Sequence, residues 1–93
     1  AELAQAVVAA GRIRQMIETQ PFSVVRHGKP SGIHHVTISI GVSAYPNDSE
    51  DPIELVEMAD SALYRAKRLG RNQVCAYRDL TEEEQNQILP ARK

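Results

Sequence analysis

The sequence has little of several residue types, and each shortage excludes a class of protein. A single cysteine, Cys75, excludes an internal disulfide framework and a cysteine-rich zinc site. There is no tryptophan, and the only aromatic side chains are one phenylalanine and three tyrosines, so a core must be built mainly from Ile, Val, Leu and Ala. No apolar run approaches the ~18–20 residues of a membrane-spanning helix, and no signal peptide is recognisable.

The sequence also lacks an excess of charge of either sign. Eleven basic and twelve acidic side chains give a formal net charge of -1, which excludes attraction of the whole chain to nucleic acid or to an anionic membrane. The length of 93 residues allows one small domain or a piece of one. Together with the lone thiol, these features predict a reduced, cytoplasmic setting, although an upstream domain could anchor the parent protein to a membrane.

Three segments carry helix signals. Apolar residues recur at spacings of three and four from Leu3 to Ile17, which predicts an amphipathic helix ending near Thr19, ahead of Pro21. The first helix has no capping residue before it, so we expect it to be cut from a longer chain.

A second helix is predicted from Pro52 to about Leu69, because Asp51 can cap it, proline suits the first helical position and Gly70 suits its close. Thr81 can cap a last short helix with three glutamates in its first turn. The final residues 90–93 are expected to fray.

Three segments read as strands. Residues 22–26 form a short predicted strand, residues 27–33 a loop with two glycines and a proline, and residues 34–45 the clearest strand, with alternating apolar side chains. We expect the first two strands to form an antiparallel pair, and residues 73–77 to form a third strand. The order helix, strand, strand, helix, strand predicts an α+β fold, with helices covering one face of a largely antiparallel sheet.

The second predicted helix carries two stripes of side chains. Small and apolar residues line one of them and allow close packing on the sheet: Val56, Ala59, Leu63, Ala66 and Gly70. A polar stripe beside it consists of Asp60, Tyr64, Lys67 and Arg71. Residues 65–71 hold four cations and no acid, so Lys67 and Arg71 could grip a polyphosphate. The alternative is that cations at a helix C-terminus only offset the helix dipole.

Other chemistry-bearing residues have simpler structural interpretations. Asp60 could orient Lys67 or a backbone group, but a solvated helix face explains it better, and Tyr64 is better explained by packing than by catalysis. Cys75 fits a small buried hydrophobe in a strand. Three histidines could suggest a metal: His27, His34 and His35. No cysteine or carboxylate lies near them in sequence, and adjacent histidines on a strand point to opposite faces, so we predict no metal site.

Three stretches together carry a family resemblance: Val-Thr-Ile-Ser-Ile-Gly-Val at 36–42, Ala-Asp-Ser-Ala-Leu-Tyr-Arg-Ala-Lys at 59–67 and Gly-Arg-Asn at 70–72. The combination resembles the C-terminal half of a GGDEF domain, the diguanylate cyclase family. The resemblance covers residues 1–78 and leaves residues 79–93 as a tail with a possible short helix. It implies a partial adenylate-cyclase-like palm fold, a sheet flanked by helices, whose N-terminal strands are missing.

The resemblance also implies a function. Diguanylate cyclases condense two GTP molecules into the bacterial second messenger cyclic di-GMP and release pyrophosphate, with Mg²⁺ and with one GTP on each protomer of a dimer. By resemblance, Lys67 and Arg71 match residues that contact GTP phosphates, with Asp60 and Asn72 as possible supports. Arg12 falls where some members carry an arginine of a secondary product-inhibition surface.

The departures from the family pattern limit what the chain can do. The Gly-Gly-Asp/Glu-Glu-Phe turn, the strand bearing a metal-binding Asp and the Arg-x-x-Asp inhibition motif all precede, in the family, the point where this chain begins. We therefore expect no catalytic residue and no metal ligand here, and no cyclic di-GMP synthesis by these residues alone. Missing strands would leave a free sheet edge, so we expect self-association, strand exchange between copies, or pairing with the missing half.

Three hypotheses remain open from the sequence. The chain is a fragment of an active diguanylate cyclase, or part of a catalytically degenerate GGDEF module that binds nucleotide or a partner, or a bare structural fragment. The sequence of the upstream turn separates the first two.

Overall fold

A computed structural model describes residues 2–91 of the protein, with side chains from residue 2 to residue 86. The elements, in chain order, are α1 (Leu3–Thr19), β1 (Phe22–Arg26), β2 (Lys29–His34), β3 (Ile40–Val42), α2 (Pro52–Arg68), β4 (Val74–Ala76), the 3₁₀ turn η1 (Tyr77–Asp79) and α3 (Glu82–Ala91). The α+β class predicted from the sequence is confirmed. None of the helices in residues 2–91 combines the length and apolar character needed to cross a membrane.

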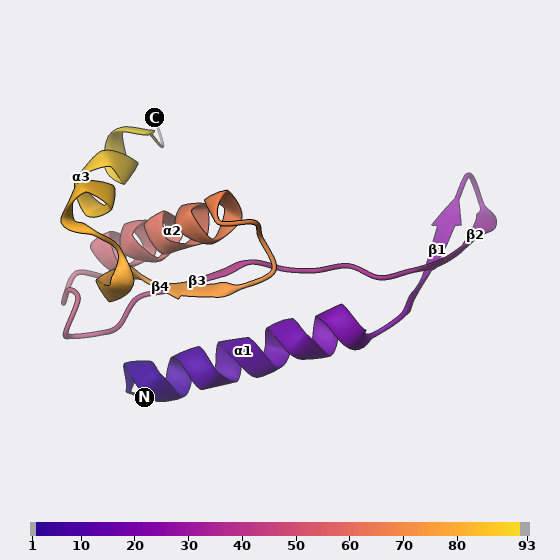
Figure 1. Ribbon diagram of the computed structural model, residues 1–93, viewed down its shortest axis with the longest axis horizontal. Helices are drawn as coiled ribbons and strands as arrows, with labels where there is room; N and C mark the ends of the chain where they lie inside the picture. The colour runs from indigo at the N-terminus through magenta and orange to yellow at the C-terminus, as the bar shows by residue number, and fades with distance from the viewer. Residues whose placement is uncertain (1, 92–93) are drawn as a thin grey trace.

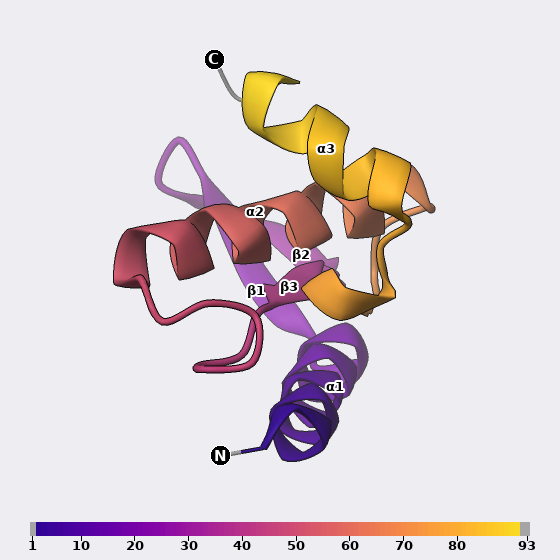
Figure 2. The same ribbon diagram turned by 90° about the vertical axis from the view of Figure 1, so that its left-hand side faces the viewer.

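The elements stack in layers around a small central sheet. Strands β3 and β4 lie between α1 and α2, and α3 packs beside α2 (Figure 1). The view turned by 90° shows the same stacking (Figure 2). The prediction that the helices share one face of the sheet is therefore wrong, because α1 and α2 cover opposite faces. The hairpin of β1 and β2 projects away from these layers (Figure 1).

Local sequence signals explain both ends of α2. The Asp51 carboxylate accepts a hydrogen bond from the Ile53 backbone N–H at 3.2 Å, and Pro52 occupies the first turn. Gly70 follows the helix with a φ of 116°, a backbone conformation that costs glycine little. The predicted start and end of this helix are thus confirmed.

The last helix also begins as predicted. The Glu84 backbone N–H donates to the Thr81 hydroxyl at 3.1 Å, and the Thr81 backbone N–H donates to the Glu84 carboxylate at 2.8 Å, a reciprocal capping box. Pro90 and Ala91, where fraying was expected, form the end of α3, and the fraying itself stays a prediction. The rest of that prediction, at Arg92 and Lys93, lies outside the described residues.

The first hairpin differs from its prediction. Strand β1 has the predicted bounds, but its partner β2 forms where a loop was expected, with Phe22 opposite His34 and Arg26 opposite Lys29. The pairing of β1 is antiparallel as predicted, but its partner is β2 and not the strand predicted at residues 34–45. His27 and Gly28 make the two-residue turn, with φ values of 52° and 75°, the positive values that a tight hairpin turn of this kind requires.

The prediction of one long strand over residues 34–45 is wrong. His34 belongs to β2, and within residues 35–45 only Ile40–Val42 forms a strand, which pairs with β4 in parallel rather than antiparallel. The strand predicted for residues 73–77 is shorter, because the chain turns into η1 at Tyr77. A strand needs hydrogen bonds to a neighbour as well as alternating side chains, and residues 35–39 have no strand assignment.

The core is small for a chain of this length. A cluster of four buried residues, Ala62, Ala66, Cys75 and Leu80, lies under α2. Ser61 is the largest described side chain that is fully buried. The predicted apolar stripes are covered only in part: Ala66 is buried, but Val56 is 61% exposed. The radius of gyration is 15.8 Å, against about 12 Å for a compact domain of this length, so much apolar surface stays uncovered.

Candidate anion-binding site

Four cations gather at the C-terminal end of α2, and the structure divides them into two pairs. Arg65 contacts two neighbouring elements. Its Nε lies 3.2 Å from a Glu84 carboxylate oxygen, and its Nη1 donates a hydrogen bond to the Asp79 carbonyl at 3.3 Å. Arg65 therefore ties α2 to the start of α3. Arg68 lies over the ring of Tyr64, with 5.9 Å between its Cζ and the ring centroid.

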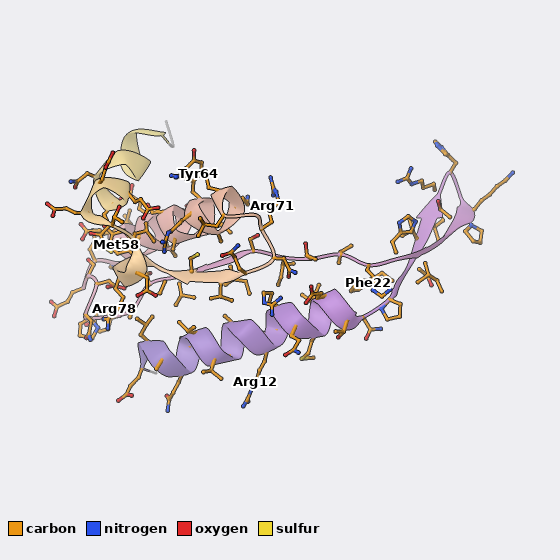
Figure 3. All side chains as sticks on the ribbon, in the orientation of Figure 1. Arg12, Phe22, Met58, Tyr64, Arg71 and Arg78 are labelled. Carbon is orange, nitrogen blue, oxygen red and sulfur yellow. The ribbon has the colours of Figure 1, made fainter. Side chains whose placement is uncertain are left out.

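The other two cations, Lys67 and Arg71, are exposed. In the part of the chain that the structure describes, neither side chain forms a salt bridge or a side-chain hydrogen bond. Figure 3 shows Arg71 projecting from the C-terminal end of α2. An ammonium and a guanidinium with no internal partner can bind an anion without first breaking a contact.

The polar stripe predicted on α2 is present and open to solvent. Asp60, Leu63, Tyr64 and Lys67 line one shallow groove. Tyr64 is 47% exposed and points outward (Figure 3), so its ring contributes to this surface and to Arg68 rather than to the core. The structure thus brings Asp60 and Lys67 to the same groove, whereas Arg71 lies just beyond it on the chain.

Asn72 occupies a different position from the exposed cations. Its side-chain Nδ2 donates to Glu18 at 2.6 Å, and its Oδ1 accepts from Arg14 at 2.9 Å. Arg14 also pairs with Glu18 at 3.2 Å along α1. The i,i+4 spacing of Arg14 and Glu18 is visible in the sequence, but their meeting with Asn72 is not, because it depends on how α1 packs against the sheet.

Arg12 lies far from this group. It is exposed on α1, and Figure 3 shows it pointing away from the central sheet, on the opposite side of the molecule from Tyr64 and Arg71. A shallow groove beside it is lined by Arg12, Gln15, Met16 and Thr19. Any anion bound at Arg12 would therefore occupy a surface separate from the one at Lys67 and Arg71.

The potential metal-ligating side chains lie apart from one another. Among residues 2–86, histidine, cysteine and carboxylate side chains form no group of three that could hold a metal. His34 instead lies with its Nε2 3.1 Å from the Ser31 carbonyl, within its own strand. These residues therefore form no ready-made cage of protein ligands, whereas magnesium is usually held by one or two carboxylates together with water and substrate phosphates.

Burial shifts the pKa values of two further groups, the Cys75 thiol and the Tyr77 phenol. Burial raises the pKa of the Cys75 thiol, with Arg65 opposing the shift. Burial raises the pKa of the Tyr77 phenol, and the charges of Asp48 and Glu54 raise it further. Both groups stay protonated and uncharged at neutral pH, as expected of packing residues.

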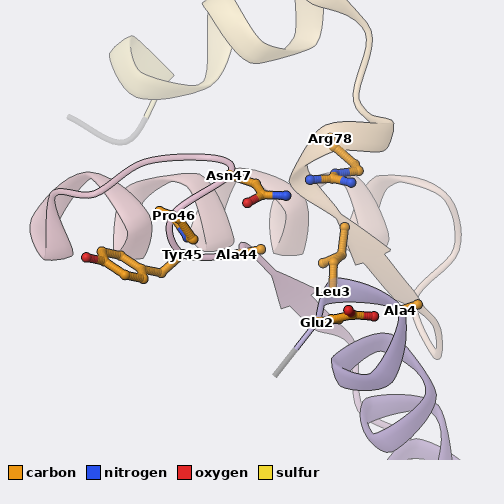
Figure 4. A pocket seen from close by; sticks show the side chains of 8 residues that line it. All are labelled: Glu2, Leu3, Ala4, Ala44, Tyr45, Pro46, Asn47 and Arg78. Atoms are coloured by element: carbon orange, nitrogen blue, oxygen red, sulfur yellow. The ribbon is translucent and has the colours of Figure 1, made fainter.

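One cavity lies away from the cations. It measures about 470 Å³ and lies between the start of α1 and the loop that precedes α2 (Figure 4). The residues that line it are Glu2, Leu3, Ala4, Ala44, Tyr45, Pro46, Asn47 and Arg78. Its lining combines one acid with one base, and it adjoins the N-terminal end of α2 rather than the end that carries Lys67 and Arg71.

Comparison with protein families gives one match, to the model described as "Diguanylate cyclase, GGDEF domain", over residues 1–73. Diguanylate cyclase A of Treponema denticola is 46% identical over 69 residues, which is 74% of this chain and 17% of that protein. The response regulator PleD of Caulobacter vibrioides is 44% identical over 72 residues, 77% of this chain and 15% of that protein. The chain therefore spans less than a fifth of the length of either relative.

A solved structure agrees with these matches. The GGDEF domain of DgcB from Caulobacter crescentus, in complex with c-di-GMP, superposes with a TM-score of 0.67 and 27% sequence identity. The superposition covers 83% of this chain and 42% of the DgcB chain. The similarity thus extends from sequence to the arrangement of helices and strands.

Proposed function

Because the chain belongs to the diguanylate cyclase GGDEF domain family, we propose that it supplies the phosphate-binding side of a GTP site. The complete enzyme would condense two GTP molecules into cyclic di-GMP and pyrophosphate in a signalling pathway of the bacterial cytoplasm. Each 3′-hydroxyl would attack the α-phosphate of the other nucleotide, so the main demands on the protein are positioning and charge neutralisation.

The proposal is carried by the contrast among the four cations of α2. Arg65 and Arg68 are engaged within the molecule, whereas Lys67 and Arg71 are exposed and unpaired among the described residues. Lysine offers a mobile point charge and arginine a planar fork, a combination suited to a triphosphate. Asp60, half-buried in the groove with Lys67, would support the lysine.

The energetic balance favours anion binding at this end of α2. The C-terminal end of a helix repels an anion by about 0.3–1 kcal/mol. Each charge-assisted hydrogen bond contributes about 1.5–3 kcal/mol. Two cations with two or more such bonds therefore outweigh the repulsion of a phosphate by the helix dipole.

The metal and the catalytic turn are not assigned to the residues of this chain. The described residues hold no group of three metal-ligating side chains, and we assign no step to the metal here. Mg²⁺ and the residues that bind it would act in the complete domain. We therefore propose that this chain binds GTP weakly by itself and makes no cyclic di-GMP.

The chain would reach a fully packed state with a partner. The exposed apolar side chains and the two-stranded central sheet favour pairing with the remainder of the GGDEF domain, or with a second copy that exchanges strands. Arg12, on the far side of α1, is proposed as a secondary surface for cyclic di-GMP. That role is independent of Lys67 and Arg71.

Titration of the 93-residue chain with GTP, followed by ¹H–¹⁵N NMR, tests the phosphate site. We expect Lys67→Ala and Arg71→Ala each to weaken binding by about tenfold or more, since each removes a charge-assisted contact. Lys29→Ala is the matched control, because Lys29 is an exposed cation on the remote hairpin. Unchanged affinity in the double variant would remove both residues from the site.

A chimera tests the enzymatic part. The aligned segment of this chain replaces its counterpart in diguanylate cyclase A of Treponema denticola, and cyclic di-GMP formation is measured by chromatography. Product formation supports a cyclase origin. A folded chimera that binds GTP without turnover supports instead the alternative, a catalytically degenerate module for nucleotide binding or protein interaction.

A further inference from the structure

The loop that presents Arg71 has an unusual backbone. Gly70, Arg71 and Asn72 follow one another with φ values of 116°, 66° and 52°. Glycine adopts such values freely and asparagine fairly readily, but a bulky side chain such as arginine does so only when its surroundings hold it there. Something in the structure must therefore fix Arg71 in this conformation.

Part of the restraint comes from the end of α2. The Arg71 backbone N–H donates to the Ala66 carbonyl at 2.9 Å, and the Gly70 N–H donates to the Lys67 carbonyl at 3.4 Å. This is the pattern of a Schellman motif. The Gln73 side chain then donates from Nε2 to the carbonyls of Leu69 and Arg71, both at 3.2 Å. These bonds join residues of the loop to one another and to the end of α2. None of them reaches α1, so they do not determine how the loop is oriented relative to α1.

Asn72 supplies that orientation. Its Nδ2 donates to Glu18 at 2.6 Å, its Oδ1 accepts from Arg14 at 2.9 Å, and its backbone N–H donates to the Ser39 hydroxyl at 3.2 Å. Both ends of one amide are thus bound by a single ion pair on α1, far away in sequence. The adjacent Arg71 side chain is outside this network and exposed.

We propose that Asn72 is a positioning residue for triphosphate binding. Held by Arg14 and Glu18, it fixes the backbone of Arg71 so that the guanidinium is presented to solvent beyond the C-terminal end of α2. The inference rests on the proposed phosphate role of Arg71 and adds a specific cause for its orientation. The ion pair on α1 thereby acts on the nucleotide site through the amide, without contacting the nucleotide.

A change of charge at Asn72 tests its contact with Arg14 and Glu18. Asn72→Asp keeps the oxygen that accepts from Arg14 but replaces the donor that meets Glu18 with a second carboxylate. The contact with Glu18 is lost, and GTP binding should weaken by about tenfold. Adding Glu18→Gln to this variant places an amide donor opposite the new carboxylate and should recover most of the affinity. Binding is measured by NMR titration of the full chain with GTP and, separately, with inorganic triphosphate.

A coupling measurement separates positioning from folding. If Asn72 acts through Arg71, Asn72→Asp has no further effect on affinity in an Arg71→Ala background, whereas an equal loss in both backgrounds overturns the inference. Arg71→Ala without effect overturns the proposed phosphate site itself. Arg71→Ala with effect and Asn72→Asp without effect overturns only the positioning role.

A second variant covers the case in which Asn72→Asp does not fold. Asn72→Gly permits the same positive φ and keeps the backbone N–H that reaches Ser39, but it removes the amide that Arg14 and Glu18 hold. Circular dichroism confirms folding, and the same titrations follow. A folded Asn72→Gly chain with wild-type affinity for triphosphate overturns the proposal, and a loss of about tenfold supports it.

Discussion

The backbone of Gly41 lies against the backbone of Leu63, so closely that a Cβ atom at Gly41 would come 2.9 Å from the Leu63 Cα. The same Cβ would overlap the Ala59 carbonyl oxygen and the Leu63 nitrogen. Strand β3 and helix α2 thus pack with no side chain between them at this point. Small residues on α2, among them Ala59, Ala62 and Ala66, make the approach possible.

This contact predicts that Gly41→Ala is strongly destabilising. The added methyl group meets backbone atoms, which cannot rotate away, so α2 must shift from the sheet. We expect a loss of about 3 kcal/mol or more in the free energy of unfolding, at or above the upper end for overpacked sites. Urea denaturation followed by circular dichroism measures it.

The matched control is Gly11→Ala. Gly11 lies inside α1, and a Cβ added there meets nothing within 4 Å. Alanine is the better helix former, so this variant should gain about 0.5–1 kcal/mol. Equal effects of the two substitutions would contradict close packing at Gly41.

The capping box of α3 predicts a dependence of helix stability on pH. The hydrogen bond from the Thr81 backbone lowers the pKa of Glu84, and the charge of Arg65 lowers it further. A carboxyl group with a depressed pKa in the folded state stabilises fully above its unfolded pKa of about 4.3 and loses this contribution as the pH falls through the folded value. Helicity should therefore drop below about pH 4.3.

Glu84→Gln should abolish most of this acid-dependent change, because glutamine does not titrate. Glu82→Gln is the comparison, since Glu82 is an exposed acid in the same turn. Circular dichroism between neutral and acidic pH provides the readout. An acid transition that is identical in all three proteins would remove Glu84 as its origin.

The uncovered apolar surface predicts self-association. Met16 is 68% exposed, and on the hairpin Val25 and Ile33 are 65% and 70% exposed. Burial of such side chains contributes about 1.5–3 kcal/mol each, so copies of the chain should pair as concentration rises. Multi-angle light scattering over a concentration series should show a mass above 10.3 kDa.

Ile33→Lys tests which surface is used, because it adds a charge to the hairpin without touching the central layers. It should shift association to higher concentration. A monomer at all concentrations, with a sharp unfolding transition, would show that the chain is stable alone and needs no partner.

The sequence predicted the helices well, because their signals are local. Asp51 with Pro52, and Thr81 with Glu84, lie within one turn of each other, so the chemistry that starts each helix is contained in a few adjacent residues. The strands were predicted poorly for the opposite reason. The alternation in residues 34–45 is a property of the segment, but the short length of β3 and its parallel pairing depend on β4, which lies beyond α2 in the chain.

The site shows the same division. The residue types and spacing of α2 by themselves determined the cluster of four cations, and the motifs at 36–42, 59–67 and 70–72 determined the family. The contact of Arg68 with Tyr64 is an i,i+4 contact within α2. Only the tertiary structure decided that Arg65 pairs with Glu84 and that Asn72 meets the Arg14–Glu18 pair. Helical periodicity places side chains around one element, whereas pairing between elements depends on packing that brings distant residues within hydrogen-bond distance.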